Sequence, residues 1–154
     1  LYANNRDDIG PNVAANYEAG LALSAEQIAW AFEEQTKIYR RTQAFFTDYD
    51  LLICPTVAVP PFAVENLYCD AINGKPLENY LDWLALTWII TTPGNPVTAL
   101  PCGLDHTGTP FGIQLIGAMQ DDRRIIGAAR ALESVLNANQ STQRPVPDFG
   151  ALSS

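Results

Sequence analysis

A chain of 154 residues that is 47% hydrophobic and 17% charged fits one globular domain with a buried core and excludes a disordered segment. Its net charge of -8, from 17 acidic and 9 basic residues, argues against a nucleic-acid partner. No apolar run reaches transmembrane length and no signal-peptide pattern occurs, so we expect a cytoplasmic protein without a membrane partner. The chain opens on Leu1 rather than Met, in sequence that looks internal to a larger protein.

Two helices are predicted before residue 50. Pro11 and Gly20 bracket a short one, with proline placed to open it and glycine to close it. Ser24 and Gln27 form a capping-box pattern, and from there apolar residues recur at three- and four-residue steps. We expect this long helix to pack against a sheet. Its apolar face comprises Ile28, Ala31, Phe32, Gln35, Ile38, Tyr39, Thr42, Phe45 and Phe46.

The middle of the chain predicts a strand, a long connection and a helix. "DLLIC", residues 50–54, is continuously apolar, as in a strand buried on both faces. "PTVAVPPF" then carries three prolines, so it should leave the strand as an extended segment. Residues 63–76 indicate a loop that ends at the turn-prone "NGKP". An amphipathic pattern over 77–88 predicts the next helix.

The last third predicts a hairpin and a covering helix. Strands near 97–104 and 111–118 are joined by "DHTGTP", whose Asp, Gly and Pro favour a tight turn. Asp121 or Asp122 can cap a helix through Asn137, in which Gly127 predicts close approach to a strand.

The resulting order is α/β, with too few strands for a complete sheet. We expect one partial domain over 1–154. It comprises a helical lead-in (10–49), strands with one intervening helix (50–120), a covering helix (121–138) and an extended tail (139–154).

The residue chemistry contains no convincing catalytic centre. Ser24 is accounted for as a helix cap, Ser134 lies within a helix, and the other serines lie in the tail, none of them in a glycine-rich elbow. Lys37 and Lys75 fit solvated surface charges better than a buried base. The three cysteines and single histidine lack metal-ligand spacing, so we expect free thiols, no metal and no cofactor.

Three weaker patterns each allow a catalytic or binding role beside a structural explanation. Cys102 with His106, oriented by Asp105, has the composition of a cysteine hydrolase, although a buried thiol beside a turn histidine explains it more simply. Carboxylates close in sequence suit helix ends better than a glycosidase pair, and Trp83 and Trp88 suit either core packing or a pocket wall. The carboxylates are Asp48, Asp50, Asp121 and Asp122.

An ordered glycine and proline array resembles the C-terminal part of amidase signature family enzymes. The pattern is an aspartate-led strand ending in Pro-Thr, then Gly-x-Pro-x-x-x-x-Pro-x-Gly, then Gly-x-Pro-x-Gly-x-Gln, an apolar pair, Gly and a downstream Asp. The resemblance covers nearly residues 10–137. The matching residues are Asp50, Pro55, Thr56, Gly94, Pro96, Pro101, Gly103, Gly108, Pro110, Gly112, Gln114, Gly117 and Asp121. By default, a glutamine such as Gln114 in an apolar strand serves buried polar groups.

The resemblance implies a fold, an activity and partners. The chain would be the C-terminal portion of the amidase signature fold, a mixed sheet flanked by helices and incomplete here. The family hydrolyses C–N amide bonds through a Ser–cis-Ser–Lys triad in the N-terminal half, so no catalytic residue is expected in this chain. Segment 83–95 would approach the substrate pocket, lined by Trp88 and Thr91. The expected partners are a small-molecule amide and the N-terminal half of the same protein, with a homodimer left open.

Two further points concern the branch of the family and an alternative function. General members often carry Asn where this chain has Thr91, whereas the tRNA amidotransferase A subunits use an Asp near Leu84 to hold the amino group of glutamine. Leu84 cannot do so, which favours a general amidase. The alternative function is a stand-alone, non-catalytic binding module derived from an amidase, which would bind a partner through exposed strand edges.

Overall fold

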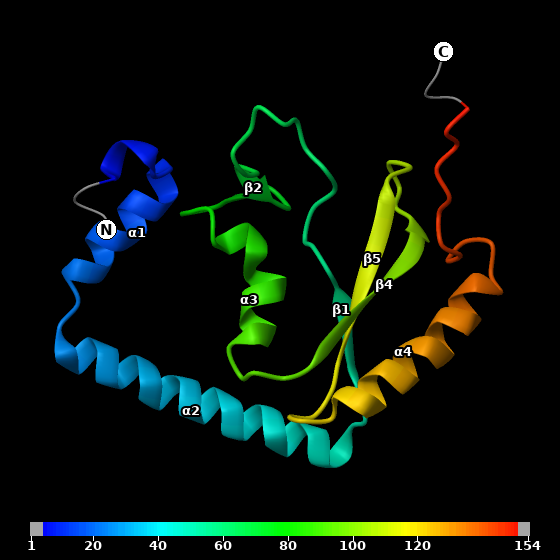
Figure 1. Cartoon of the computed structure of the whole chain (residues 1–154), viewed down its shortest axis with the longest axis horizontal. Coiled ribbons are helices and arrows are strands. Elements are labelled where there is room, and N and C mark those ends of the chain that lie inside the picture. The colour runs from blue at the N-terminus through cyan, green and yellow to red at the C-terminus, as the bar shows by residue number, and fades with distance from the viewer. Residues whose placement is uncertain (1–4, 151–154) are drawn as a thin grey trace.

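The computed structural model of the protein describes residues 5–150. Figure 1 shows α2 running beneath α3 and the sheet, with α4 beside the sheet. The helices and strands, in chain order, are η2 (Arg6–Asp8), α1 (Pro11–Leu21), α2 (Ala25–Asp48), β1 (Leu52–Pro55), β2 (Ala71–Ile72), β3 (Lys75–Pro76), η3 (Asp82–Leu84), α3 (Ala85–Thr91), β4 (Val97–Leu104), β5 (Pro110–Ile116) and α4 (Asp122–Asn137), where η marks a 3-10 helix.

The main sheet has three strands in the order β1-β5-β4, and both pairings are antiparallel. In the register, Gln114 of the central strand lies opposite Cys54 on one side and Ala99 on the other. The hairpin predicted around "DHTGTP" is confirmed, with β5 beginning at Pro110 and ending at Ile116. The α/β class with an incomplete sheet is confirmed as well.

The core lies between this sheet and α4. Leu100, Leu115 and Ala129 form its buried centre, and Leu132 and Leu136 of α4 pack against it. The covering helix predicted to end at Asn137 is confirmed. Its N-cap residue is Asp121, but no side chain caps this end, contrary to the expectation from the aspartates. The Asp121 carboxylate instead faces the Arg124 guanidinium at 3.7 Å.

The predicted close approach at Gly127 is wrong, and the tight position is Gly117. A methyl group added at Gly127 would have nothing within 4 Å, because this residue lies on the exposed side of α4. A methyl group at Gly117 would overlap the side chain of Ile125, which is fully buried. The glycine that lets helix and sheet approach each other is therefore at the end of the strand.

The long helix α2 begins with the capping box that the sequence predicts. Ser24 Oγ accepts a hydrogen bond from the Gln27 backbone N–H at 3.1 Å, and the Gln27 side chain accepts one from the Ser24 N–H at 2.8 Å. The predicted packing of its whole apolar face on a sheet is wrong. Ile38 and the residues near Phe45 are half-buried, but Phe32 in the first half is 65% exposed.

Strand β1 is shorter and more exposed than predicted. It begins at Leu52, and Ile53 is 50% exposed rather than buried. The physical reason is its position, because within residues 5–150 β1 pairs with β5 alone, and α4 lies against β4 and β5. Asp50, just before the strand, forms an exposed ion pair with Arg124 of α4.

The helix predicted over 77–88 is wrong in its first half. The backbone N–H of Leu77 donates to the Asp70 carbonyl at 2.9 Å, which ties it to a small hairpin formed by β2 and β3. The Asp82 carboxylate then accepts from the backbone N–H groups of Glu78 and Asn79, which holds a turn. Regular helix starts only at Ala85 and continues to Thr91. The turn at "NGKP" is confirmed, since Asn73 and Gly74 both have positive φ.

Candidate functional site

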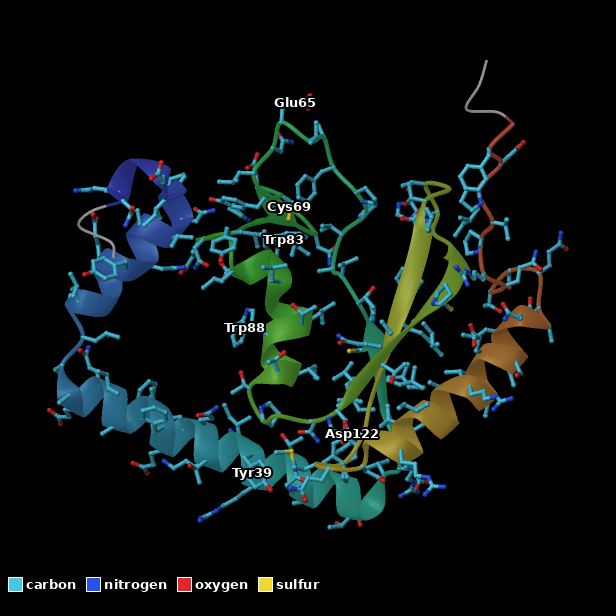
Figure 2. The ribbon with its side chains drawn as sticks, viewed as in Figure 1. Tyr39, Glu65, Cys69, Trp83, Trp88 and Asp122 are labelled. Atoms are coloured by element: carbon cyan, nitrogen blue, oxygen red, sulfur yellow. The ribbon has the colours of Figure 1, made fainter. Side chains whose placement is uncertain are left out.

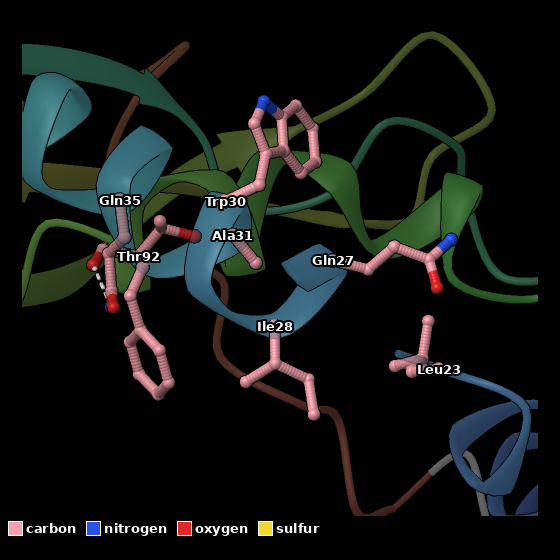
Figure 3. A pocket seen from close by; sticks show the side chains of 8 residues that line it. Leu23, Gln27, Ile28, Trp30, Ala31, Gln35 and Thr92 are labelled. Atoms are coloured by element: carbon pink, nitrogen blue, oxygen red, sulfur yellow. Dashed lines mark hydrogen bonds between the residues drawn. The ribbon is translucent and has the colours of Figure 1, made fainter. Parts of the chain in front are cut away.

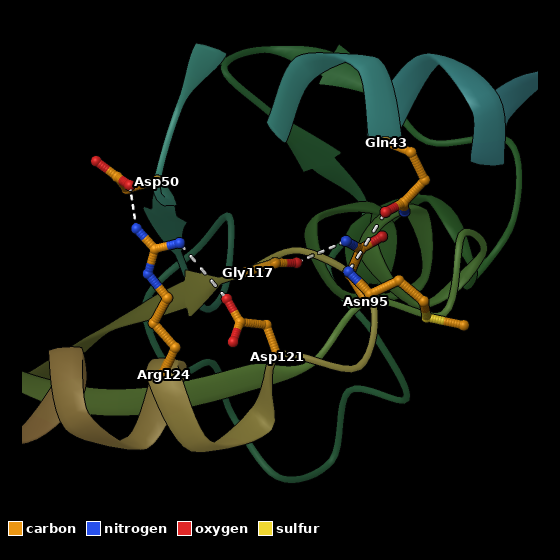
Figure 4. A network of polar contacts seen from close by, with 7 residues as sticks. Gln43, Asp50, Asn95, Gly117, Asp121 and Arg124 are labelled. Carbon is orange, nitrogen blue, oxygen red and sulfur yellow. Dashed lines mark hydrogen bonds and ion pairs between the residues drawn. The ribbon is translucent and has the colours of Figure 1, made fainter. Parts of the chain in front are cut away.

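The turn between α3 and β4 is fixed to the sheet by a buried asparagine. Asn95 is 8% exposed, and its Nδ2 donates to the carbonyl of Gly117 at 2.6 Å. The backbone N–H of Gly117 in return donates to the Pro96 carbonyl at 3.1 Å. Gly94 makes the bend with a φ of 76°, which favours glycine. Figure 4 shows how these contacts join the turn to the end of β5.

Gln114 fixes α3 itself to the sheet. Its side chain is 5% exposed, and Nε2 donates to the carbonyls of Leu86 at 2.8 Å and Pro55 at 3.1 Å. The interpretation of Gln114 as a residue that serves buried polar groups is confirmed. Thr56, which follows Pro55 in the pattern, donates both its backbone N–H and its hydroxyl to the Gly112 carbonyl, each at 3.0 Å. Residues of the glycine and proline array thus hold β1, β5 and α3 together by hydrogen bonds, and we call this part of the fold the scaffold.

The two residues predicted to line a substrate pocket lie on the outer side of this scaffold. Trp88 is 46% exposed, and its indole N–H donates to the Leu81 carbonyl at 2.9 Å, which holds the ring in place. Figure 2 shows Trp88 on the side of α3 that faces away from the sheet. Thr91 is exposed one turn further on, with its hydroxyl donated to the Thr87 carbonyl at 3.0 Å. Their role in substrate binding stays a prediction.

Thr91 also borders a cleft of mixed polarity between α2 and the α3–β4 turn, with a volume of about 380 Å³. The hydroxyls of its three threonines donate to main-chain carbonyls of their own helices. Its lining residues are Gln35, Thr36, Tyr39, Thr91, Thr92, Pro93, Gly94 and Met119.

An apolar groove adjoins this cleft and has a volume of about 540 Å³. Gln35 and Thr92 line both the cleft and the apolar groove. Gln35 Nε2 donates to the Thr92 carbonyl at 3.1 Å, at the boundary between the cleft and the groove. Figure 3 shows this bond beside the first half of α2. The lining residues of the apolar groove are Leu23, Gln27, Ile28, Trp30, Ala31, Phe32, Gln35 and Thr92. Sequence reasoning missed the groove, although the exposed apolar face of α2 was its signal.

Asp105, which could orient His106 in a cysteine hydrolase, uses its carboxylate to accept hydrogen bonds within its own turn. Its Oδ1 accepts from the Thr107 hydroxyl at 2.6 Å and from the backbone N–H groups of Thr107 and Thr109, and its Oδ2 accepts from the Thr109 hydroxyl. The Thr107 hydroxyl is the main reason why the pKa of Asp105 lies well below its ordinary value. Cys102 is half-buried in β4, and His106 is exposed in the turn. These contacts make Asp105 a turn residue.

The remaining candidate side chains also have structural contacts. Ser134 donates its hydroxyl to the Arg130 carbonyl at 3.1 Å, and Lys37 lies 2.8 Å from both Glu33 and Glu34. The Trp83 ring packs edge-on against Phe62, with 5.5 Å between centroids. Within residues 5–150, no group of three or more His, Cys, Asp or Glu side chains is arranged to hold a metal ion. No helix in that range is both long enough and apolar enough to cross a membrane.

The family model described as Amidase matches residues 2–126, so this chain belongs to the amidase family. The A subunit of glutamyl-tRNA(Gln) amidotransferase from Synechococcus sp. (strain CC9902) is 33% identical over 133 residues, which cover 86% of this chain and 24% of the subunit. The structure of a bacterial aryl acylamidase of the amidase signature family superposes with a TM-score of 0.75 at 29% identity, covering 87% of this chain and 28% of that one. A solved amidase gives a TM-score of 0.76 at 22% identity, covering 87% and 30%.

These matches confirm the family and the fold that the glycine and proline array indicates. The chain spans about a quarter of the length of the curated relatives it matches. Relatives in the comparison include tRNA amidotransferase A subunits, so the preference for a general amidase, drawn from Leu84, stays a prediction.

Proposed function

We propose that this chain is the C-terminal part of an amidase that hydrolyses C–N bonds of small carboxamides. In this proposal it is a single partial domain that supplies strands, a covering helix and one wall of the substrate pocket. The Ser–Ser–Lys triad belongs to the N-terminal half of the same protein, and neither a metal nor a cofactor takes part. The family match over residues 2–126 and the coverage of about a quarter of the relatives support this assignment.

One observation carries the proposal: the polar groups of the array face inward, while Trp88 and Thr91 face outward. Asn95 and Gln114 use their amide donors on main-chain carbonyls within the scaffold. Such a scaffold keeps α3 in place and takes no part in proton transfer. It presents the Trp88 ring and the Thr91 hydroxyl on the outer side of α3, where a substrate can reach them. That arrangement suits a pocket wall.

The reaction in the intact enzyme follows from the family resemblance. The nucleophilic serine attacks the amide carbonyl, and its proton passes through the second serine to a neutral lysine. Backbone N–H groups stabilise the tetrahedral oxyanion. The leaving amine takes up a proton, and water then releases the acid. In this scheme Trp88 packs against the apolar part of the substrate and Thr91 lies at the pocket rim.

The first test of this proposal is the gene that encodes the chain. The codons that precede Leu1 should encode a Gly/Ser-rich segment with a Ser-Ser pair and, further upstream, a lysine. The polypeptide with that segment should release nitroaniline from para-nitroacetanilide or ammonia from small carboxamides, and replacing the nucleophilic serine with alanine should abolish the release. An upstream sequence without these residues, or turnover by the present chain alone, would refute the assignment.

The second candidate function is the stand-alone binding module. The observation that favours it is the pair of outer strands, because β1 and β4 each pair on one side only within the described sheet. An open strand edge can accept a partner strand. This function predicts that the chain by itself is monodisperse and melts cooperatively. Aggregation of the purified chain would count against it.

A further inference from the structure

The first half of α2 carries an apolar surface on both of its sides. Phe32 is 65% exposed and Trp30 is 63% exposed, and Figure 3 shows Trp30 pointing away from Ile28. Leu23, just before the helix, adds to the apolar groove and is 52% exposed. Contiguous apolar surface of this kind marks an interaction site in most proteins.

The second half of the same helix is already packed. Ile38, Phe45 and Phe46 are half-buried, and Gln43 Oε1 accepts from the backbone N–H of Met119 at 3.4 Å. The apolar stripe is continuous along the helix, but among the described residues its neighbours cover only the second half. The first half, from Leu23 to Phe32, is therefore left open for a partner surface.

The apolar groove is held open by contacts that do not depend on a partner. Gln35 is bonded to the Thr92 carbonyl, and Thr92 in turn donates its backbone N–H to the Trp88 carbonyl at 3.0 Å. These bonds fix the groove wall between α2 and α3. A preformed apolar hollow binds a folded surface at a low cost in conformational entropy.

We infer that the apolar groove and the exposed Trp30 and Phe32 dock the part of the amidase fold that this chain does not contain. The inference rests on the proposed function, and it names the surface through which the two parts meet. The size of the relatives supports this occupant over others. In the aryl acylamidase structure, 87% of this chain superposes on elements that make up only 28% of a longer chain. That chain therefore offers ample protein to cover an apolar helix.

The test co-expresses this chain with the tagged aryl acylamidase polypeptide from which the superposed segment has been deleted. The wild-type chain should co-purify as a one-to-one complex, and Phe32→Asp should weaken the complex by at least about tenfold. Ile28→Asp, one turn earlier on the same helix, should act in the same way. Val135→Asp is the matched control, because Val135 is a 67% exposed apolar residue of α4 outside the groove.

The outcomes separate docking from function. Loss of co-purification in Phe32→Asp and Ile28→Asp, with Val135→Asp unaffected, supports the inference even if the complex does not hydrolyse para-nitroacetanilide. A complex that hydrolyses the anilide and tolerates both groove variants refutes the docking surface and leaves the proposed function standing. Absence of a wild-type complex overturns the inference. So does a dimer of this chain alone that Phe32→Asp converts to a monomer, because the occupant is then a second copy.

Discussion

The side chain of Gln114 joins α3 to the sheet by donating Nε2 to the carbonyl of Leu86 at 2.8 Å. The same nitrogen also reaches the Pro55 carbonyl at 3.1 Å. One buried amide therefore connects three segments that are far apart in sequence: the end of β1, the first turn of α3 and the central strand β5. These two hydrogen bonds help to set the position of α3, and with it that of Trp88, relative to the sheet.

Replacing Gln114 with leucine should destabilise the chain and loosen α3. The carbonyls of Leu86 and Pro55 would lose this donor, and the loss of both hydrogen bonds costs about 2 kcal/mol. Urea denaturation should show the loss, and amide hydrogen exchange should be faster within Ala85–Thr91 than in α4. Gln27→Leu is a poor comparison because it breaks a cap, so the control is Gln140→Leu in the exposed tail. Equal stability of Gln114→Leu and wild type would contradict a bracing role.

Replacing Asn95 with aspartate should give a pH-dependent loss of stability. The variant has no donor for the Gly117 carbonyl while it is ionised, and burial raises the pKa of the new carboxyl above its unfolded value. When protonated, the carboxyl can donate to that carbonyl. The deficit relative to wild type should thus be small below about pH 4 and grow to about 2 kcal/mol at neutral pH.

Chemical denaturation of both proteins across this pH range measures the deficit in Asn95→Asp. Asn66→Asp provides the control, because Asn66 is exposed in a turn and the change adds the same charge. A deficit in Asn95→Asp that does not vary with pH would show that the Asn95–Gly117 bond is not the cause.

Local patterns in the sequence predicted the elements that local contacts fix. The Ser24–Gln27 capping box, the Asn73–Gly74 turn and α4 are set by residues a few positions apart, and all were predicted. The first half of the helix predicted over 77–88 is wrong because a periodic pattern cannot reveal that the Asp82 carboxylate accepts from two backbone N–H groups.

The site was less predictable than the fold for a related reason. The Gln35–Thr92 bond joins residues 57 positions apart, so the groove that it borders has no local signature. The family resemblance predicts Trp88 and Thr91 as pocket-lining residues, and their outward orientation on α3 emerges only from the structure.

Alanine at Gly117 and at Gly127 should shift stability in opposite directions. At Gly117 the added methyl group overlaps Ile125 in the core, which should cost about 1–3 kcal/mol. At Gly127 it meets nothing, and alanine favours an exposed helix by about 0.5–1 kcal/mol. Thermal unfolding of the two variants measures both effects. A destabilised Gly127→Ala would mean that α4 has a neighbour at that position.

The Asp105 carboxyl should titrate below the usual range for aspartate. The Thr107 hydroxyl is the main cause of this lowered pKa, so Thr107→Val should raise it toward its ordinary value. A group with a lowered folded pKa stabilises the hairpin above its unfolded pKa, and this stabilisation is lost as the pH falls through the folded pKa. Carboxyl-carbon NMR measures the titration. Thr47→Val, whose hydroxyl bonds the Ala44 carbonyl, should leave the Asp105 curve unchanged.

Trp88 should affect substrate binding in the enzyme with its triad region present, as described under the proposed function. Trp88→Ala removes an exposed ring that packs on the substrate equally in the ground and transition states, so KM for para-nitroacetanilide should rise about tenfold with little change in kcat. Trp88→Phe keeps an aromatic ring but loses the bond to the Leu81 carbonyl, and it should retain most of the affinity. Steady-state kinetics separates the two parameters. A fall in kcat at unchanged KM would contradict uniform binding by the ring, because the lost interaction would then form only in the transition state.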